Sequence, residues 1–149
     1  MTQTRRVIQV PGVEEAMRVL LRAEDSDGSL GAVEMWMGPG EAGPPLHRHG
    51  LHAESFYVLE GEMTLRVGDA RVADGPGLWA TAPAGVPHTL ANFSSGPARV
   101  LCLFSPGGFE RRFQRMLASD PEREGLAELA EAERETELLG PPMEPPSPS

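Results

Sequence analysis

Short strand-like segments separated by turns rich in glycine and proline predict an all-β protein, built as an antiparallel jelly roll of two sheets. From residue 18 to residue 104 these segments recur about 8 to 12 residues apart, which favours an antiparallel sandwich or barrel over a parallel α/β fold. After Ser105 the apolar residues recur at helical spacing, so two short α-helices are expected to follow. A chain of 149 residues is long enough for one domain with a hydrophobic core.

Turn signals bound each predicted strand. The turn Asp25-Ser26-Asp27-Gly28 separates the first two strands, and the glycine- and proline-rich residues 38–45 predict a loop that leads into the strand of His47. Glu60-Gly61-Glu62 predicts a β-hairpin between the strands on either side of it. The predicted strands comprise residues 18–22, 30–37, the segment at His47, 55–59, 63–67, 70–73, 78–81, 88–93 and 98–104.

The C-terminal part is predicted to be helical and then irregular. Phe109, Phe113, Met116 and Leu117 have helical spacing, and a second helix opens at Asp120-Pro121, an N-cap followed by a proline at the first helical position. The apolar and acidic pattern of this second helix runs through Leu126, Leu129, Ala130, Glu133 and Glu137. We therefore divide the chain into a β-barrel with its N-terminal strands (1–107), a helical extension of the same domain (108–139) and a proline-rich tail (140–149). The charged helix faces are interpreted as solvated surface, with a cover over the barrel mouth or a partner subunit as the alternative.

Composition excludes several classes of function. A formal net charge of −9 argues against nucleic-acid binding, because the phosphates of nucleic acid bind to clusters of basic side chains, which this chain lacks. The chain contains no lysine, which removes Schiff-base chemistry, and its single cysteine, Cys102, lies in an apolar segment where it is expected to pack as a small hydrophobe. No apolar stretch is long enough for a membrane span or a secretory signal, so we expect a cytoplasmic protein with no membrane partner.

All four histidines fall in two short segments, 44–54 and 83–88. His47 and His49 are two residues apart, so an extended strand places both imidazoles on one face as a chelating pair. Glu54 has the wrong parity for the same unbroken strand, but a bend at Gly50 can redirect it, and His88 must come from a distant strand. Three neutral imidazoles and one carboxylate suit a divalent ion of Fe, Mn, Ni, Co, Cu or Zn, and a six-coordinate ion would keep two positions open.

The spacing around these residues resembles the two motifs of the cupin family. The second motif is matched at every marked position by Gly77-x5-Pro83-x-Gly85-x2-His88-x3-Asn92. Most of the first motif is matched by His47-x-His49-x4-Glu54-x6-Gly61. The first motif departs at position 41, where Glu41 stands in place of the expected glycine between Gly40 and Gly43, which we interpret as a one-residue shift in a turn. The resemblance, to small single-domain bacterial cupins described as quercetinase-like, covers residues 30 to 105.

This resemblance implies a double-stranded β-helix, the cupin jelly-roll barrel, that binds one divalent metal ion per chain. Its implied ligands are His47, His49, Glu54 and His88, and Glu54 is the implied catalytic residue. His52 lies outside the ligand positions, so it is interpreted as a solvent-facing or rim residue, or alternatively as one that supports a ligand. Family analogy also suggests a homodimer.

Strand parity predicts the lining of the pocket. If Glu54 and His88 point inward, Phe56 and Val58 share the face of Glu54, and Leu90 and Asn92 share the face of His88. Four further candidates come from their aromatic or flexible apolar character, namely Met35, Trp36, Met37 and Trp79. An apolar pocket around an open metal favours a small aromatic or enolic ligand over a sugar phosphate.

The resemblance favours a metal-dependent dioxygenase that acts on an aromatic, enol or diketone-like substrate chelated to the metal. Two alternatives remain open, because one barrel hosts many chemistries. The first is a small-molecule sensor or carrier without turnover, and the second is a non-redox isomerase or lyase using zinc or manganese. The partner expected in every case is a small molecule.

Overall fold

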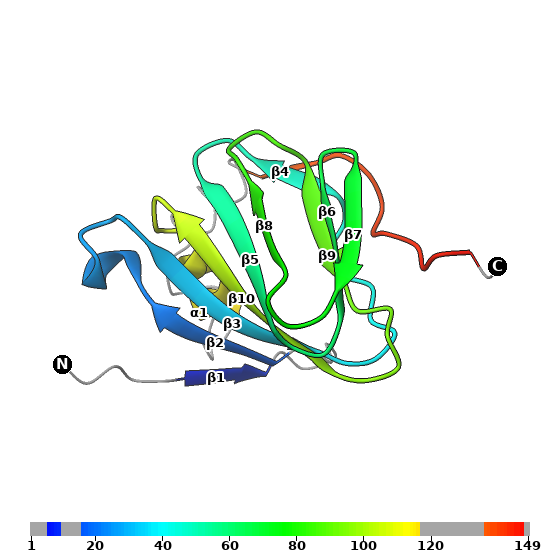
Figure 1. Ribbon diagram of the computed structural model, residues 1–149. Coiled ribbons are helices and arrows are strands. Elements are labelled where there is room, and N and C mark those ends of the chain that lie inside the picture. Colours follow the sequence, from blue (N-terminus) through cyan, green and yellow to red (C-terminus); the bar gives the residue numbers. More distant parts are fainter. Residues whose placement is uncertain (1–5, 10–15, 117–135, 148–149) are drawn as a thin grey trace.

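The computed structural model describes residues 6–9, 16–116 and 136–147, and these form two antiparallel sheets that face each other (Figure 1). The first sheet has six strands in the order β1-β2-β3-β10-β5-β8, and the second has five in the order β11-β4-β9-β6-β7. This arrangement confirms the predicted all-β jelly roll. No helix in the described part of the chain is long and apolar enough to cross a membrane.

The strand bounds follow the expected turn signals closely. The six-stranded sheet consists of β1 (Arg6–Gln9), β2 (Ala16–Leu21), β3 (Gly31–Met37), β10 (Ala98–Ser105), β5 (Ala53–Glu60) and β8 (Trp79–Ala82). The five-stranded sheet consists of β11 (Thr136–Leu138), β4 (His47–His49), β9 (His88–Ala91), β6 (Met63–Val67) and β7 (Ala70–Asp74).

The core fills the space between the inner faces of the two sheets. Alternate residues of β5 and β10 are buried, as the period of a β-strand requires when one face meets the core. The central core side chains are Val33, Met37, Phe56, Val58, Met63, Leu65, Val100, Cys102 and Phe104. Cys102 is therefore a buried core residue, as predicted.

Two helical segments close one end of the molecule. A 3-10 turn, η1 (Ala23–Asp25), follows β2, and α1 (Glu110–Met116) follows β10. Glu110 is fully buried and its carboxylate accepts hydrogen bonds from the backbone N–H groups of Ala23 (3.2 Å) and Gly108 (2.6 Å). These charge-assisted bonds fix the start of α1 against η1. The first predicted helix is thus confirmed.

The second predicted helix falls mainly on residues 117–135, which lie outside the described residues. Its last member, Glu137, was predicted wrongly, because Thr136–Leu138 forms strand β11 beside β4. Without β11, the edge of β4 would carry backbone N–H and C=O groups that lack hydrogen bonds. Pairing with these groups stabilises the strand more than the local helical pattern stabilises a helix. The tail that follows is extended and its Met143 is buried, so the described part of the tail packs against the domain.

The predicted hairpin between residues 55–59 and 63–67 is also wrong. Strand β5 pairs with β10 and β8, whereas β6 pairs with β9 and β7 in the opposite sheet. Gly61 has a φ of 71°, and a Cβ there would lie 2.3 Å from the carbonyl oxygen of Pro97. A glycine at this position would also suit a hairpin, but in this structure it forms a corner between the two sheets. Strands β5 and β6 therefore present their apolar faces to the same core.

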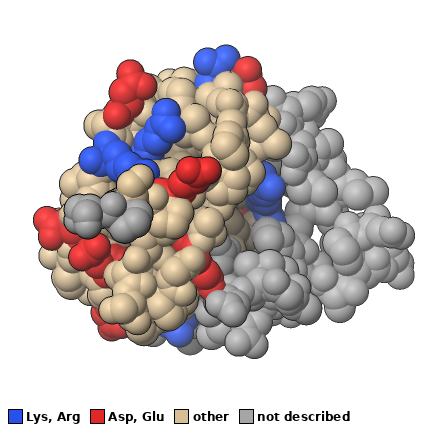
Figure 2. All heavy atoms as spheres, turned by 90° about the vertical axis from the view of Figure 1, so that its right-hand side faces the viewer, with Lys and Arg blue, Asp and Glu red and all other residues tan. Residues whose placement is uncertain are grey.

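Charged side chains are interspersed on the face of the molecule shown in Figure 2. Arginine and acidic side chains lie near one another there, without a continuous basic patch.

Replacing Gly61 with alanine is expected to lower the free energy of unfolding by at least about 2 kcal/mol, because the left-handed backbone costs about 1–2 kcal/mol and the Cβ collides with backbone atoms. Gly96→Ala is the matched control, since a Cβ at Gly96 meets nothing within 4 Å. Urea denaturation of both variants measures the difference, and equal stabilities would contradict the corner described here.

Candidate metal centre

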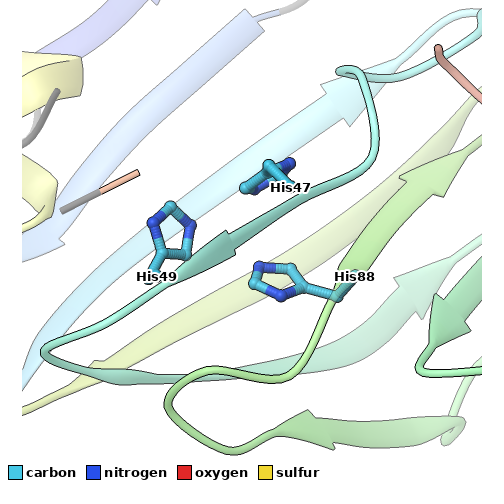
Figure 3. A group of neighbouring side chains, drawn as sticks. All are labelled: His47, His49 and His88. Atoms are coloured by element: carbon cyan, nitrogen blue, oxygen red, sulfur yellow. The ribbon is translucent and has the colours of Figure 1, made fainter. Parts of the chain in front are cut away.

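Three histidines from two strands converge at one end of the core (Figure 3). His47 and His49 lie on β4 and His88 opens β9, where it stands opposite His47 in the ladder. One ring nitrogen from each can be chosen so that all three lie within 4.8 Å of one another. The two-residue spacing of His47 and His49 thus puts both rings on the inner face, as the strand period requires.

Hydrogen bonds at Nδ1 orient all three rings. The Nδ1 of His47 is 2.7 Å from the carbonyl oxygen of Pro45, and the Nδ1 of His88 is 3.0 Å from that of Val86. Because a carbonyl oxygen only accepts, Nδ1 must carry the proton in both rings, which leaves the lone pair on Nε2. His49 Nδ1 lies 3.1 Å from the hydroxyl oxygen of Thr136. Such outer hydrogen bonds are typical of histidines that bind metals.

The Nε2 atoms show that the site suits a metal ion. His49 Nε2 is buried and has no hydrogen-bond partner in the described part of the protein, and the buried His88 Nε2 faces the carboxylate of Glu54 at 3.4 Å. A buried polar atom without a partner costs free energy, on the order of 1–3 kcal/mol. A divalent ion bound by these lone pairs would remove that cost, so the donor set and its burial both fit a metal held by His47, His49 and His88.

Burial shifts the protonation of these imidazoles. Desolvation lowers the pKa of His47, and it lowers the pKa of His49 to about 2 with help from the neighbouring His52 and His47. Desolvation also acts to lower the pKa of His88, but the nearby carboxylate of Glu54 and the Val86 carbonyl raise it overall. His47 and His49 are therefore held neutral, which is the form that binds metal.

Glu54 approaches the histidines from the opposite sheet. It lies on β5, is buried, and its Oε2 is 3.4 Å from His88 Nε2. The chain turns at residues 50–52 between β4 and β5, so Glu54 reaches the site from a different strand and its parity relative to His49 no longer matters. The cluster of donor atoms within 4.8 Å of one another contains the three histidines, and Glu54 stands beside it through its contact with His88, so its role as a fourth ligand stays a prediction.

Aromatic residues enclose His49 on its other side. His52 is buried, so it is not solvent-facing, and its ring stacks on His49 with centroids 4.4 Å apart. Phe109, just before α1, lies 4.3 Å from the His49 ring and 4.8 Å from that of His52. Sequence reasoning missed both Phe109 and Thr136 as neighbours of the site. The pair Gly107-Gly108 was a signal that the chain turns sharply before Phe109.

The predicted pocket residues separate into two groups. Five of them lie on the inner faces in the core, namely Met35, Met37, Phe56, Val58 and Leu90. Asn92 is also buried, but its amide donates to the carbonyl oxygens of Met37 and Gly96 and so anchors a turn.

Trp36 and Trp79 lie outside the space between the sheets. Trp36 is on the outer face of β3, in contact with the guanidinium groups of Arg18 and Arg99. Trp79 is 52% exposed and donates to the hydroxyl of Thr81. Their positions on the strands have the opposite parity to the core residues, so the prediction that they line the pocket is wrong.

A two-sheet jelly roll with a histidine cluster that could hold a metal ion is typical of cupins, and the comparisons agree on the family. The cupin domain model matches residues 33–104. The chain therefore belongs to the cupin family.

Solved structures resemble this chain over most of the barrel. TT1209 from Thermus thermophilus is 35% identical, with a TM-score of 0.50 over 53% of this chain and 74% of that chain. A predicted oxalate decarboxylase from Thermotoga maritima is 23% identical, with a TM-score of 0.60 over 69% and 92%. The polyketide cyclase RemF from Streptomyces resistomycificus is 24% identical, with a TM-score of 0.57 over 70% and 79%. The last two show the fold alone. None of the curated proteins matches the chain significantly.

Acid is expected to destabilise the metal-free protein through His49. Its pKa is about 2 in the folded chain against an ordinary value of 6.5, so between these values the unfolded chain binds a proton that the folded chain does not. Its contribution to the free energy of unfolding should fall by about 1.4 kcal/mol for each unit of pH below about 6.5.

His49→Asn, which does not titrate, isolates this contribution from that of the carboxylates. Urea denaturation of both chelator-treated proteins between about pH 6.5 and 4.5 should give a shallower pH slope for the variant. Parallel slopes would show that His49 is not held neutral by its surroundings.

Proposed function

We propose that this cupin is a metal-dependent dioxygenase that acts on a small aromatic, enolic or diketone-like substrate chelated to the metal. The observation that carries the proposal is the convergence of three imidazoles, one of them with a buried Nε2 that lacks a hydrogen-bond partner among the described residues, beside the buried carboxylate of Glu54. A six-coordinate ion held by the three imidazoles alone would have three open positions, enough for two substrate oxygens and dioxygen while Glu54 is not coordinated.

His47, His49 and His88 hold the metal in this proposal, and the acceptors at their Nδ1 atoms keep the lone pairs directed at it. A bound first-row ion supplies Lewis acidity and a template that orients the substrate. Glu54 takes the proton from an acidic substrate hydroxyl, and it is placed for this because it is buried next to the ligand His88.

The surroundings of the histidines support an apolar, aromatic substrate class. Phe56 lies 5.9 Å from the His88 ring, and Phe104 and Phe109 lie 5.5 Å and 4.8 Å from that of His52. These buried rings make the surroundings of the histidines apolar, which suits a flat enolic molecule better than a sugar phosphate. One of the fold neighbours is named as a polyketide cyclase, which is in keeping with this substrate class.

The first test is metal analysis of untagged protein, purified without nickel resin or chelator, by plasma mass spectrometry. We expect about one Fe, Mn, Ni, Co or Cu per chain, and loss of most of it in His88→Ala, because that variant removes one of three converging nitrogen donors. Absence of metal from both proteins would contradict the proposal and favour a binding barrel without a metal.

The second test is oxygen uptake by the metal-loaded protein with flavonols and diketones. Glu54→Gln keeps the shape of the side chain and an oxygen donor, so it should lose at least about 100-fold in the rate of uptake while it keeps bound metal. Trp79→Phe, on the outer face, is the control that should leave the rate unchanged. A zinc-loaded protein without oxygen uptake would favour a non-redox isomerase or lyase instead.

A further inference from the structure

The metal-binding strand β4 is held by the C-terminal segment of the chain. On one side β4 meets β9 through a single ladder pair, His47 with His88. On the other side all three of its residues pair with β11, with Thr136 opposite His49 and Leu138 opposite His47. Strand β11 therefore supplies most of the ladder pairing of β4.

Further contacts extend this attachment beyond the ladder. The backbone N–H of Leu139 donates to the carbonyl oxygen of Leu46 at 2.8 Å, and that of Leu46 donates to the carbonyl oxygen of Pro141 at 3.3 Å. On the outer face Arg48 and Glu137 form an ion pair at 2.6 Å. The backbone contacts hold the register that brings the Thr136 side chain next to His49, and the exposed ion pair adds little to it.

His49 differs from the other two histidines in the source of its Nδ1 partner. His47 and His88 each use the carbonyl oxygen of the residue two positions before them, so their orientation is set locally. The partner of His49 is the hydroxyl of Thr136, 87 residues away in the sequence and 3.1 Å away in space.

A hydroxyl differs from a carbonyl because it can either accept from Nδ1–H or donate to a bare Nδ1. Only the first arrangement leaves the lone pair on His49 Nε2. The second places a proton on a buried nitrogen that has no hydrogen-bond partner among the described residues, which is unfavourable for metal binding and for burial alike.

We propose that Thr136 is a positioning residue of the metal centre, whose hydroxyl accepts from His49 Nδ1–H and thereby directs Nε2 at the ion. The proposal rests on the proposed function, since it assigns the metal to the three histidines. It adds that the geometry of one ligand depends on a side chain that the C-terminal strand delivers.

The experiment compares three variants by competition with a chromophoric chelator for Zn²⁺ and for Co²⁺. Thr136→Val keeps the shape and removes the acceptor, so the metal dissociation constant should rise about 10- to 100-fold, as loss of an outer hydrogen bond to a ligand does. Thr136→Ser keeps the hydroxyl and should stay within about threefold of the unchanged protein. Glu137→Gln removes the ion pair with Arg48 on the outer face, and it should also stay within about threefold.

The control variant separates the hydroxyl from general docking of β11. Equal weakening by Glu137→Gln and Thr136→Val would overturn the specific role of Thr136, and so would unchanged affinity in Thr136→Val. Thermal unfolding of each metal-free variant checks that the fold is kept.

A second measurement needs no variant and no metal. Nitrogen-15 NMR of the metal-free protein should show His49 as the Nδ1–H tautomer, and Thr136→Val should shift its ring toward a mixture of tautomers. An Nε2–H tautomer in the unchanged protein would refute the positioning role. Failure of the unchanged protein to bind metal, with the Nδ1–H tautomer present, would refute the proposed function but not the orientation of His49 by Thr136.

Discussion

The ladder pair between His47 and His88 is the contact on which the metal centre depends. It joins the two motif segments, and it fixes where the edge strand β4 lies against β9. Because the side chains of paired residues point to the same face of a sheet, this one pair brings two imidazoles together without any further device. The period of the strand places the His49 side chain on the same face as that of His47. Glu54 lies on β5 in the facing sheet, and packing of the two sheets on their common core brings it next to the histidines.

The cluster is costly to bury, and the protein tolerates it through specific contacts. Each of the three imidazoles has an acceptor or hydroxyl at Nδ1, the Phe109 ring packs against His49, and the Nε2 of His49 is buried. Glu110 supports the cluster indirectly. Its carboxylate accepts hydrogen bonds from the backbone of Ala23 and Gly108 and so holds the segment that carries Phe109. A preorganised binding site of this kind gains affinity by limiting the movement of its ligands.

Local patterns in the sequence predicted the strands and the histidine cluster, but not the contacts between distant segments. Strand-like segments bounded by turn signals located β5, β6 and β10, and the spacing of His47 and His49 placed both on one face. The assignment of β5 and β6 to opposite sheets was not predictable, because Gly61 suits a hairpin and a corner equally well. Thr136 lies in a segment with a helical pattern, and only its pairing with β4 shows its relation to His49. Phe109 and His52 likewise meet through tertiary packing.

The pairing of β4 with β11 also sets an order for assembly. The strands that carry the three histidines end at His49 and Ala91, so both leave the ribosome well before residues 136–138. Until the later segment emerges, β4 is a short strand with a single ladder pair on one side and open backbone groups on the other, and closing so long a loop is slow. The nascent barrel can thus bury its core while β4 is still loosely held, so that the arrangement of the three histidines is the last part of the molecule to form.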